Sequence, residues 1–405
     1  MEIKECFQPI EVTTHNLQFH ETPNITSLDF HNNYVFTSGQ DRAVRLWEVI
    51  LTDKNTYYKS NCYKTAENSS IKLKFSCEFT FFNDPVNIVR TYKNTKDEDI
   101  IFVAGTETGS IWYVRISKEK VNEIFSGSEK PFIKKLTKID GNGCIDLCFL
   151  EETKVAAVFL SGEIKIIEIK EKRQNKENLL DTQTLVEKNE SVSDEQKENE
   201  FVETPQVKEV KVFKAWNDKN DYKANILYWK KIHEGIIQGI SFCSKTNVIV
   251  TKALDNQLKI FQIVNNILVH KDTVKKEMDK THGANKRILV NKKKVYNFIR
   301  KNKLHVYEIA ESESSNENEN GLKLSAEYGP FNAPLVKVMK EGLFLVIVTK
   351  KSVYILYKDK KVAYVDNVAF REITDAFISK GIIFYCAQDG FLGSIRLNME
   401  STKNI

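Results

Sequence analysis

A unit of three short strands repeats along the chain, and this repeat constrains the fold more than any other feature. The clearest copy is Ile25–Val49, in which ITSLDF, YVFTSGQD and RAVRLWEV follow one another across short turns. Each run mixes polar residues with β-branched or aromatic ones, which is the pattern of strands with a buried face. The later units begin near Val86, Cys144, Gly239, Lys294, Pro334 and Ile373, which makes seven in all.

Seven small sheets of this kind cannot cover their own faces and must stack on one another. Blades arranged radially around an axis leave only short, protected edges. The sequence therefore predicts an all-β fold, a single seven-bladed β-propeller over residues 1–397. We place the blades at about 20–50, 77–117, 131–170, 210–264, 285–310, 322–358 and 364–397.

Three segments depart from this pattern. Residues 171–209 hold 11 acidic and 6 basic residues, a net charge of −5, with few apolar side chains. Such a composition cannot bury enough surface to offset chain entropy, so we predict a disordered acidic insertion between blades three and four. Residues 311–321, ESESSNENENG, are predicted to form a low-complexity loop, and residues 398–405 a short tail.

Composition excludes several classes of protein. The chain is 41% apolar and 28% charged, near globular averages, and its net charge of +5 is too small to indicate a nucleic-acid groove. The longest apolar run, Leu343–Val348, is far shorter than the ~20 residues of a membrane helix, and the opening MEIKECFQPI does not resemble a secretory signal. The 7 scattered cysteines suit a reducing compartment and form no zinc motif.

The first unit contains a polar quartet to which we assign a structural role. Asp41 favours the tight turn, and the indole N–H of Trp47 needs a partner when buried. We expect Ser38 to accept that N–H and His20 to bond Ser38. A weaker echo of the quartet is His233, Thr251, Asp255 and Phe261, in which the aromatic residue has no N–H.

No catalytic motif accompanies these residues. The sequence has no Walker-type phosphate loop, no G-x-S-x-G elbow and no H-E-x-x-H helix. We therefore predict no enzymatic activity, no catalytic residue, no cofactor and no metal site.

The unit SGQDRAVRLWEV resembles the WD-repeat family, and three further segments narrow the resemblance. FHETPNITSLDF, PVNIVR and IHEGIIQGISF…ALDNQLKIFQI are similar to segments that occur in the same order in the WD-repeat middle subunit of chromatin assembly factor 1. The final ITDAF…AQDGFLGSIRL is similar to the last blade of that family. A sister family, the histone regulator type of WD-repeat histone chaperone, shares the first-blade pattern.

The resemblance implies a non-enzymatic scaffold subunit in the nucleus, in a complex that deposits histones three and four on newly replicated DNA. The implied partners are the large and small subunits of that complex and the histones. The histones would be bound either directly or through the large subunit. Longer relatives bind an anti-silencing class histone chaperone through a C-terminal tail, whereas this chain ends at Ile405. Histones are basic, so the acidic insertion is a candidate histone contact, or else a solvated spacer.

Two sets of residues are candidates for binding partners. Asp389, Gly390 and Phe391 form the turn of the last unit, and Phe391 favours the chromatin assembly family over its sister. Lys292, Lys293 and Lys294 lie within KRILVNKKKVYNFIRKNK, residues 286–303, which has 8 basic and no acidic residues. This stretch could contact DNA phosphates, face an acidic subunit, serve nuclear import or form a solvated outer face of blade five.

Two other functions stay open at this stage. One is replication-independent histone deposition of the histone regulator type. The other is a generic propeller adaptor, either a substrate receptor of a ubiquitin ligase or a ribosome-assembly scaffold. The partners that co-purify with the protein would separate these alternatives.

Overall fold

The computed structural model describes residues 11–16, 24–51, 63–65, 71–93, 98–137, 142–171, 212–213, 222–275, 288–299, 301–309, 322–358, 360–369 and 371–397. His20, most of the acidic insertion at 171–209, the loop at 311–321 and the tail at 398–405 lie outside these residues.

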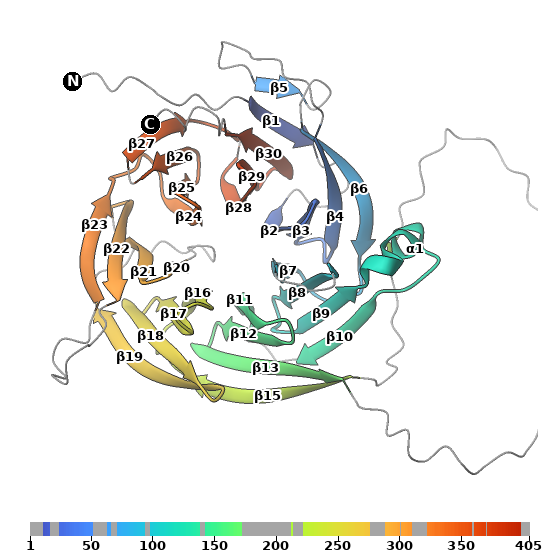
Figure 1. Ribbon diagram of the computed structural model, residues 1–405, viewed down its shortest axis with the longest axis horizontal. Helices are drawn as coiled ribbons and strands as arrows, with labels where there is room; N and C mark the ends of the chain where they lie inside the picture. The colour runs from blue at the N-terminus through green and yellow to red at the C-terminus, as the bar shows by residue number, and fades with distance from the viewer. Residues whose placement is uncertain are drawn as a thin grey trace, which may run out of the picture.

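The described chain forms seven antiparallel sheets arranged around a central axis, which confirms the predicted seven-bladed propeller (Figure 1). Each blade has four strands, ordered from the axis to the rim. The strands are β2 Ile25–His31, β3 Tyr34–Gly39, β4 Val44–Leu51 and β6 Ile71–Phe79 in blade one; β7 Val86–Thr91, β8 Ile100–Thr106, β9 Ile111–Ile116 and β10 Phe132–Thr137 in blade two; β11 Cys144–Glu151, β12 Lys154–Phe159, β13 Glu163–Glu171 and β15 Tyr222–Lys231 in blade three; β16 Ile237–Cys243, β17 Val248–Ala253, β18 Gln257–Val264 and β19 Ile267–Lys275 in blade four; β20 Leu289–Asn291, β21 Lys294–Ile299, β22 Lys303–Ile309 and β23 Leu322–Tyr328 in blade five; β24 Leu335–Glu341, β25 Phe344–Thr349, β26 Val353–Tyr357 and β27 Lys360–Val365 in blade six; and β28 Ile373–Ser379, β29 Ile382–Ala387, β30 Phe391–Arg396 and β1 Glu11–Asn16 in blade seven.

The blade boundaries differ from those predicted. The strand that precedes each unit in the sequence is the outermost strand of the blade before it: β10 belongs to blade two and β15 to blade three. The acidic insertion therefore falls inside blade three, between its third strand β13 and its fourth strand β15, and not between blades three and four. Outermost strands have one partly exposed face, so their apolar pattern is too weak to assign them from sequence.

The two ends of the described chain meet in one sheet. Strand β1 pairs antiparallel with β30, in the register Glu11↔Arg396 to Asn16↔Phe391, and is the fourth strand of blade seven. Two short strands add to the rim in parallel pairing: β5 Tyr63–Thr65 lies beside β1, and β14 Val212–Phe213 lies beside β6. Pairing of the first and last strands closes the ring with backbone hydrogen bonds and protects the edge of β30.

The core is divided into seven apolar clusters, one between each pair of neighbouring blades. Strand β3 shows why: Val35 packs towards blade seven with Trp47, whereas the next residue, Phe36, packs towards blade two. Both faces of the inner strands are thus buried, which explains the uninterrupted apolar run of β12.

The only helical elements of the described residues lie between β9 and β10. A 3-10 turn at Lys118–Lys120 leads into α1, Val121–Ser126, which ends at Gly127 in a left-handed conformation with φ 77°. Ile124 anchors this helix in the cluster between blades one and two. No described helix has both the length and the apolarity that crossing a bilayer requires.

Candidate functional site: blade turns and the central cavity

Three residues of the predicted fourth-blade quartet come together. His233 is 1% exposed, and its Nδ1 lies 2.9 Å from Asp255 Oδ2 while its Nε2 lies 2.9 Å from Thr251 Oγ1. Burial acts to raise the pKa of Asp255, but the hydrogen bonds from His233 and from the backbone N–H groups of Gln257 and Glu234 leave that pKa lowered. Phe261 is buried on β18 opposite Ile249. The triad joins the loop before β16 to the β17–β18 turn.

In blade one the predicted partner of Trp47 is wrong by one residue. The indole Nε1 donates to Thr37 Oγ1 at 3.0 Å, whereas Ser38 Oγ lies 3.1 Å from Thr26 Oγ1. Thr37 pairs with Arg45 and Val35 with Trp47, so Thr37 shares a face with Trp47, and Ser38 points to the other face. Aligning TSGQD with TKALD, the fourth-blade segment that contains Thr251, would have identified Thr37 from sequence.

Asp41 lies in the turn between β3 and β4 and forms an ion pair with a buried cation. Its carboxylate accepts from Arg45, which also donates to Glu78 Oε1 at 2.6 Å, and Arg45 is 3% exposed. Because a buried guanidinium flanked by two carboxylates is well compensated, this group fixes the turn to β4 and β6. His20, the fourth member predicted for this blade, lies outside the described residues.

The candidate turn of the last blade repeats this turn chemistry. Asp389 accepts from the backbone N–H groups of Phe391 and Arg371, each at 3.2 Å, just as Asp255 accepts from Gln257 and Glu234. Gly390 has φ 81°, which a glycine adopts without strain. Phe391 is half-buried at the start of β30. Asp389 thus has a structural role, and both Asp389 and Phe391 are partly exposed to solvent.

The described residues of the basic stretch, 288–299 and 301–303, do not form one continuous basic face. Lys292 and Lys293 are exposed in the β20–β21 turn, and Lys294 at the start of β21 lies 3.7 Å from Glu308. Tyr296 and Phe298, the two aromatic residues interleaved with the bases of this stretch, are each 2% exposed and pack between blades five and six. Because strand alternation sends these rings inward, they cannot stack on a nucleic-acid base.

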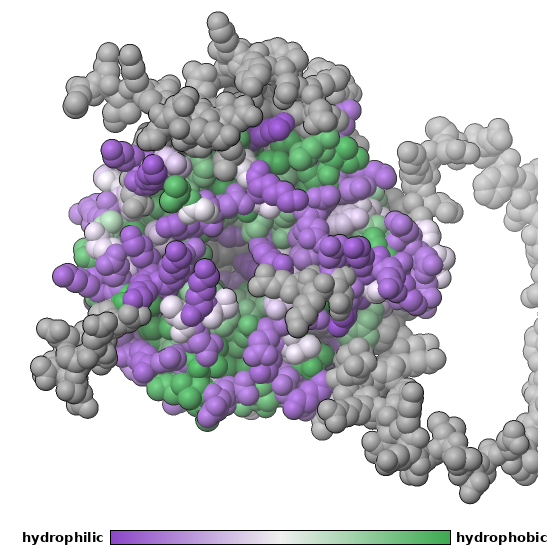
Figure 2. Space-filling view, viewed as in Figure 1, coloured by the Kyte–Doolittle hydropathy of each residue, from purple (hydrophilic) through white to green (hydrophobic). Residues whose placement is uncertain are grey.

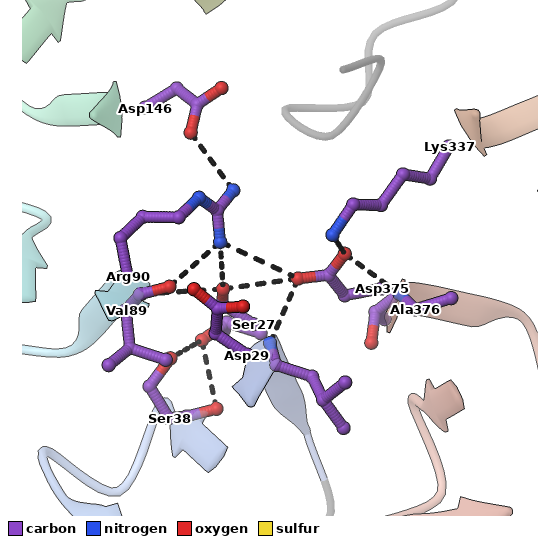
Figure 3. A network of polar contacts seen from close by, with 12 residues as sticks. Ser27, Asp29, Ser38, Val89, Arg90, Asp146, Lys337, Asp375 and Ala376 are labelled. Atoms are coloured by element: carbon purple, nitrogen blue, oxygen red, sulfur yellow. Dashed lines mark hydrogen bonds and ion pairs between the residues drawn. The ribbon is translucent and has the colours of Figure 1, made fainter. Parts of the chain in front are cut away.

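Sequence reasoning missed a polar network at the centre of the ring (Figure 3). It links the inner strands of several blades through Ser27, Asp29, Arg90, Asp146, Lys337 and Asp375. All six side chains are mostly or fully buried. The network spans positions far apart in sequence, and only closure of the ring brings them together.

Arg90 and Asp375 are the centres of this network. Arg90 Nη2 donates to Asp146 Oδ1 at 3.0 Å, and Arg90 Nη1 donates to Ser27 Oγ at 3.3 Å and lies 4.0 Å from Asp375 Oδ2. Asp375 accepts from Lys337 Nζ at 3.0 Å and from Ser27 Oγ at 3.1 Å. Burial opposes the charge of Arg90, but the surrounding carboxylates leave its pKa raised.

Asp29, Asp146 and Asp375 form the same kinds of hydrogen bond in blades one, three and seven. Each accepts from the backbone N–H of its own next residue and from a backbone N–H of the following blade. Those inter-blade donors are Thr91 for Asp29, Ile240 for Asp146 and Leu28 for Asp375, at 2.8, 3.3 and 2.8 Å. The recurrence of Asp in SLDF, CIDLCF and ITDAF was the available sequence signal. These carboxylates hold neighbouring blades in register.

A cavity of about 650 Å³ opens beside this network. Its wall includes Asp29, Arg90 and Lys337 of the network and the aromatic rings of Tyr92, Phe149, Phe242 and Phe377. Polar residues dominate the ring face in Figure 2, which is hollowed near its middle.

The charges around this cavity are already matched to one another. Lys93 Nζ lies 3.3 Å from Asp29 Oδ1 and 3.6 Å from the centre of the Phe377 ring. Burial alone would raise the pKa of Asp29, but Lys93 and Arg90 leave it lowered. A guest in this cavity would therefore gain contacts with the aromatic wall more than with an unmatched charge.

Comparison with known proteins identifies the fold but assigns the chain to no family. No family model matches the sequence, and no curated protein matches it. Among solved structures, the crystal structure of the computationally designed Ika8 protein is similar, with a TM-score of 0.51 and 12% identity over 95% of this chain and 99% of that chain. At that identity the likeness concerns the fold alone, and propellers serve many unrelated functions. The described residues contain no group of three or more His, Cys, Asp or Glu side chains placed to hold a metal ion.

Proposed function

We propose that the protein is a non-enzymatic WD-repeat scaffold subunit of a nuclear histone chaperone that deposits histones three and four on newly replicated DNA. The observation that carries the proposal is where the resembling segments lie. NITSLDF, PVNIVR and ITDAF contribute β2, β7 and β28, and these strands supply Asp29, Arg90 and Asp375 to the central network. The resemblance thus falls on residues that form one physical unit.

The fold suits a scaffold because it is rigid and offers many separate surfaces. Seven inter-blade cores and inter-blade aspartates fix the sheets relative to one another. The turns at both ends and the rim strands can then dock different partners on one frame. The large and small subunits of the complex would occupy such surfaces.

Two charged regions are candidate contacts within this proposal. The acidic insertion, residues 171–209, would attract basic histones and increase their association rate. Lys292 and Lys293, in an exposed turn, would meet DNA or an acidic subunit. Deleting the insertion should lower the amount of histone that co-purifies with the protein. Unchanged histone recovery would mean that the insertion is only a solvated spacer. Reversing the charge of both lysines tests the turn through DNA binding and complex assembly.

Tandem affinity purification followed by mass spectrometry tests the proposal as a whole. We expect histones three and four together with a large acidic subunit and a small subunit. Recovery of a cullin adaptor or of pre-ribosomal proteins in place of histones would refute the proposal and favour a generic adaptor. Recovery of histones in cells arrested outside DNA replication, with no replication proteins, would favour the histone regulator type.

A further inference from the structure

The rim strand of blade three exposes two large apolar side chains. On β15, Ile226 is 48% exposed and Trp229 is 60% exposed. β15 is the edge of its sheet and lies next to β10, the rim strand of blade two (Figure 1). Edge strands are where sheets pair with other chains, so two exposed apolar side chains on this strand are a candidate interaction surface.

A β-bulge places both residues on the same side of the sheet. Tyr228 pairs with Ile166 and Ile226 pairs with Ile167, so Leu227 is an extra residue in β15. Residues three apart in a regular strand would face opposite sides, but the bulge turns Ile226 and Trp229 to the same side. That side faces blade two, because Ile167 belongs to the cluster between blades two and three.

Lys165 lies beneath this surface. It pairs with Trp229 across the strands and is 4% exposed, with Nζ 4.0 Å from the centre of the Trp229 ring and 5.9 Å from that of Phe159. Burial lowers the pKa of Lys165, against a smaller opposing effect of Glu163. The described residues place no carboxylate within 4.0 Å of this ammonium. Glu163 instead accepts from Ser161 and Asn142.

The charge at this place favours an anionic ligand. A largely desolvated ammonium without a carboxylate partner gains more from an arriving anion than a hydrated surface lysine would. Lys230 pairs with Ile164 of the cluster between blades three and four, so it lies on the other side of the sheet, and Lys231 already bonds Glu234 at 2.6 Å. The apolar neighbours favour a ligand that also carries an apolar side chain, which fits a peptide better than a sugar–phosphate chain.

We propose that this surface, made of Lys165, Ile226 and Trp229, binds an acidic segment of a partner protein. A carboxylate of that segment bonds Lys165, and an adjacent apolar side chain packs on Trp229 and Ile226. This proposal goes beyond the histone-deposition proposal and does not rest on it.

The test is fluorescence anisotropy of the full chain with a labelled synthetic peptide in which Glu alternates with Leu. We expect saturable binding that Lys165→Met weakens roughly tenfold, the scale of one charge-assisted hydrogen bond. Lys165→Met keeps the apolar stem, Lys165→Arg should restore binding, and Trp229→Ala should abolish it. The matched control is Lys271→Met, at an exposed lysine on the rim strand of blade four. Thermal unfolding of each variant verifies that it is folded.

Several results would overturn the proposal. A peptide with Gln in place of Glu that binds equally well would remove the role of Lys165, as would binding that Lys165→Met and Lys271→Met change equally. Single-stranded RNA that binds more tightly than the peptide, and competes with it, would make the surface a nucleic-acid site. Peptide binding seen only after deletion of residues 172–211 would show that the chain's own acidic segment is the occupant.

Discussion

Replacing Asp375 with alanine should destabilise the ring more than any other single change in the central network. Asp375 is fully buried and accepts from Lys337 Nζ at 3.0 Å, from Leu28 N at 2.8 Å and from Ser27 Oγ at 3.1 Å. The side chain of Lys337 is only 13% exposed, so its ammonium cannot regain full hydration when the carboxylate is removed. Breaking a buried pair in this way costs about 3–5 kcal/mol in the free energy of unfolding.

Guanidinium unfolding followed by tryptophan fluorescence and circular dichroism measures this cost. With a slope of about 5 kcal/mol per molar, the midpoint should fall by about 0.6–1 M. Asp375→Asn keeps one acceptor oxygen and should cost less, about 1–3 kcal/mol. Lys337→Met combined with Asp375→Asn should cost less than the sum of the two single changes, because the two groups interact directly.

The control is Glu308→Gln, which removes a carboxylate that is 52% exposed and 3.7 Å from Lys294. An exposed pair of this kind contributes less than about 1 kcal/mol. If Asp375→Ala shifted the midpoint no further than this control, the assignment of inter-blade stability to buried aspartates would be refuted.

Three further predictions concern other parts of the ring. Thr37→Val should lower the melting temperature, because it leaves the indole N–H of Trp47 without its hydroxyl acceptor, which costs about 1–3 kcal/mol in the free energy of unfolding. Thr37→Ser keeps the hydroxyl and should not lower it. Equal effects of the two substitutions would contradict the hydrogen bond. Burial lowers the pKa of His31 below its usual 6.5, so the folded state favours the neutral imidazole, and the free energy of unfolding should fall as the pH drops below 6.5. His31→Gln should flatten this dependence in chemical unfolding measured at a series of pH values below 6.5. Deleting residues 1–16 removes β1 and should make blade seven sensitive to limited proteolysis. Deleting residues 1–10 keeps β1 and should not. Equal sensitivity of the two variants would mean that β1 does not protect the blade.

The strand pattern was sufficient to predict the architecture because most residues in the inner strands of each blade are buried, on both faces of the sheet. The runs IIFVAGT of β8 and VIVTKA of β17 are buried throughout, so sequence identifies them easily. β23, LKLSAEY, has no buried residue, and rim strands of this kind were assigned to the wrong blade or overlooked. The first strand of the chain was missed as part of blade seven because its partner lies at the opposite end of the sequence.

Site residues were predictable only where the interaction is local. His233, Thr251 and Asp255 lie within one blade and the loop that enters it, and the repeat alignment brings them together. The bond between Asp375 and the Leu28 N–H spans 347 residues and depends on ring closure. The surface at Trp229 depends on a bulge, and a single sequence gives no signal for one inserted residue in a strand.

Synthesis of this protein on the ribosome has an unusual order because β1 is made first and β30 is made last. Strand β1 has no partner strand to join until β30 has been translated, so its backbone donors and acceptors stay hydrated while the blades behind it assemble. The last hydrogen-bonded contact to form is then also the one of greatest separation along the chain, and its loop-closure entropy delays the finished ring. A nascent chain stalled just short of β30 would carry nearly complete blades in an open arc that no partner requiring the closed circle could recognise.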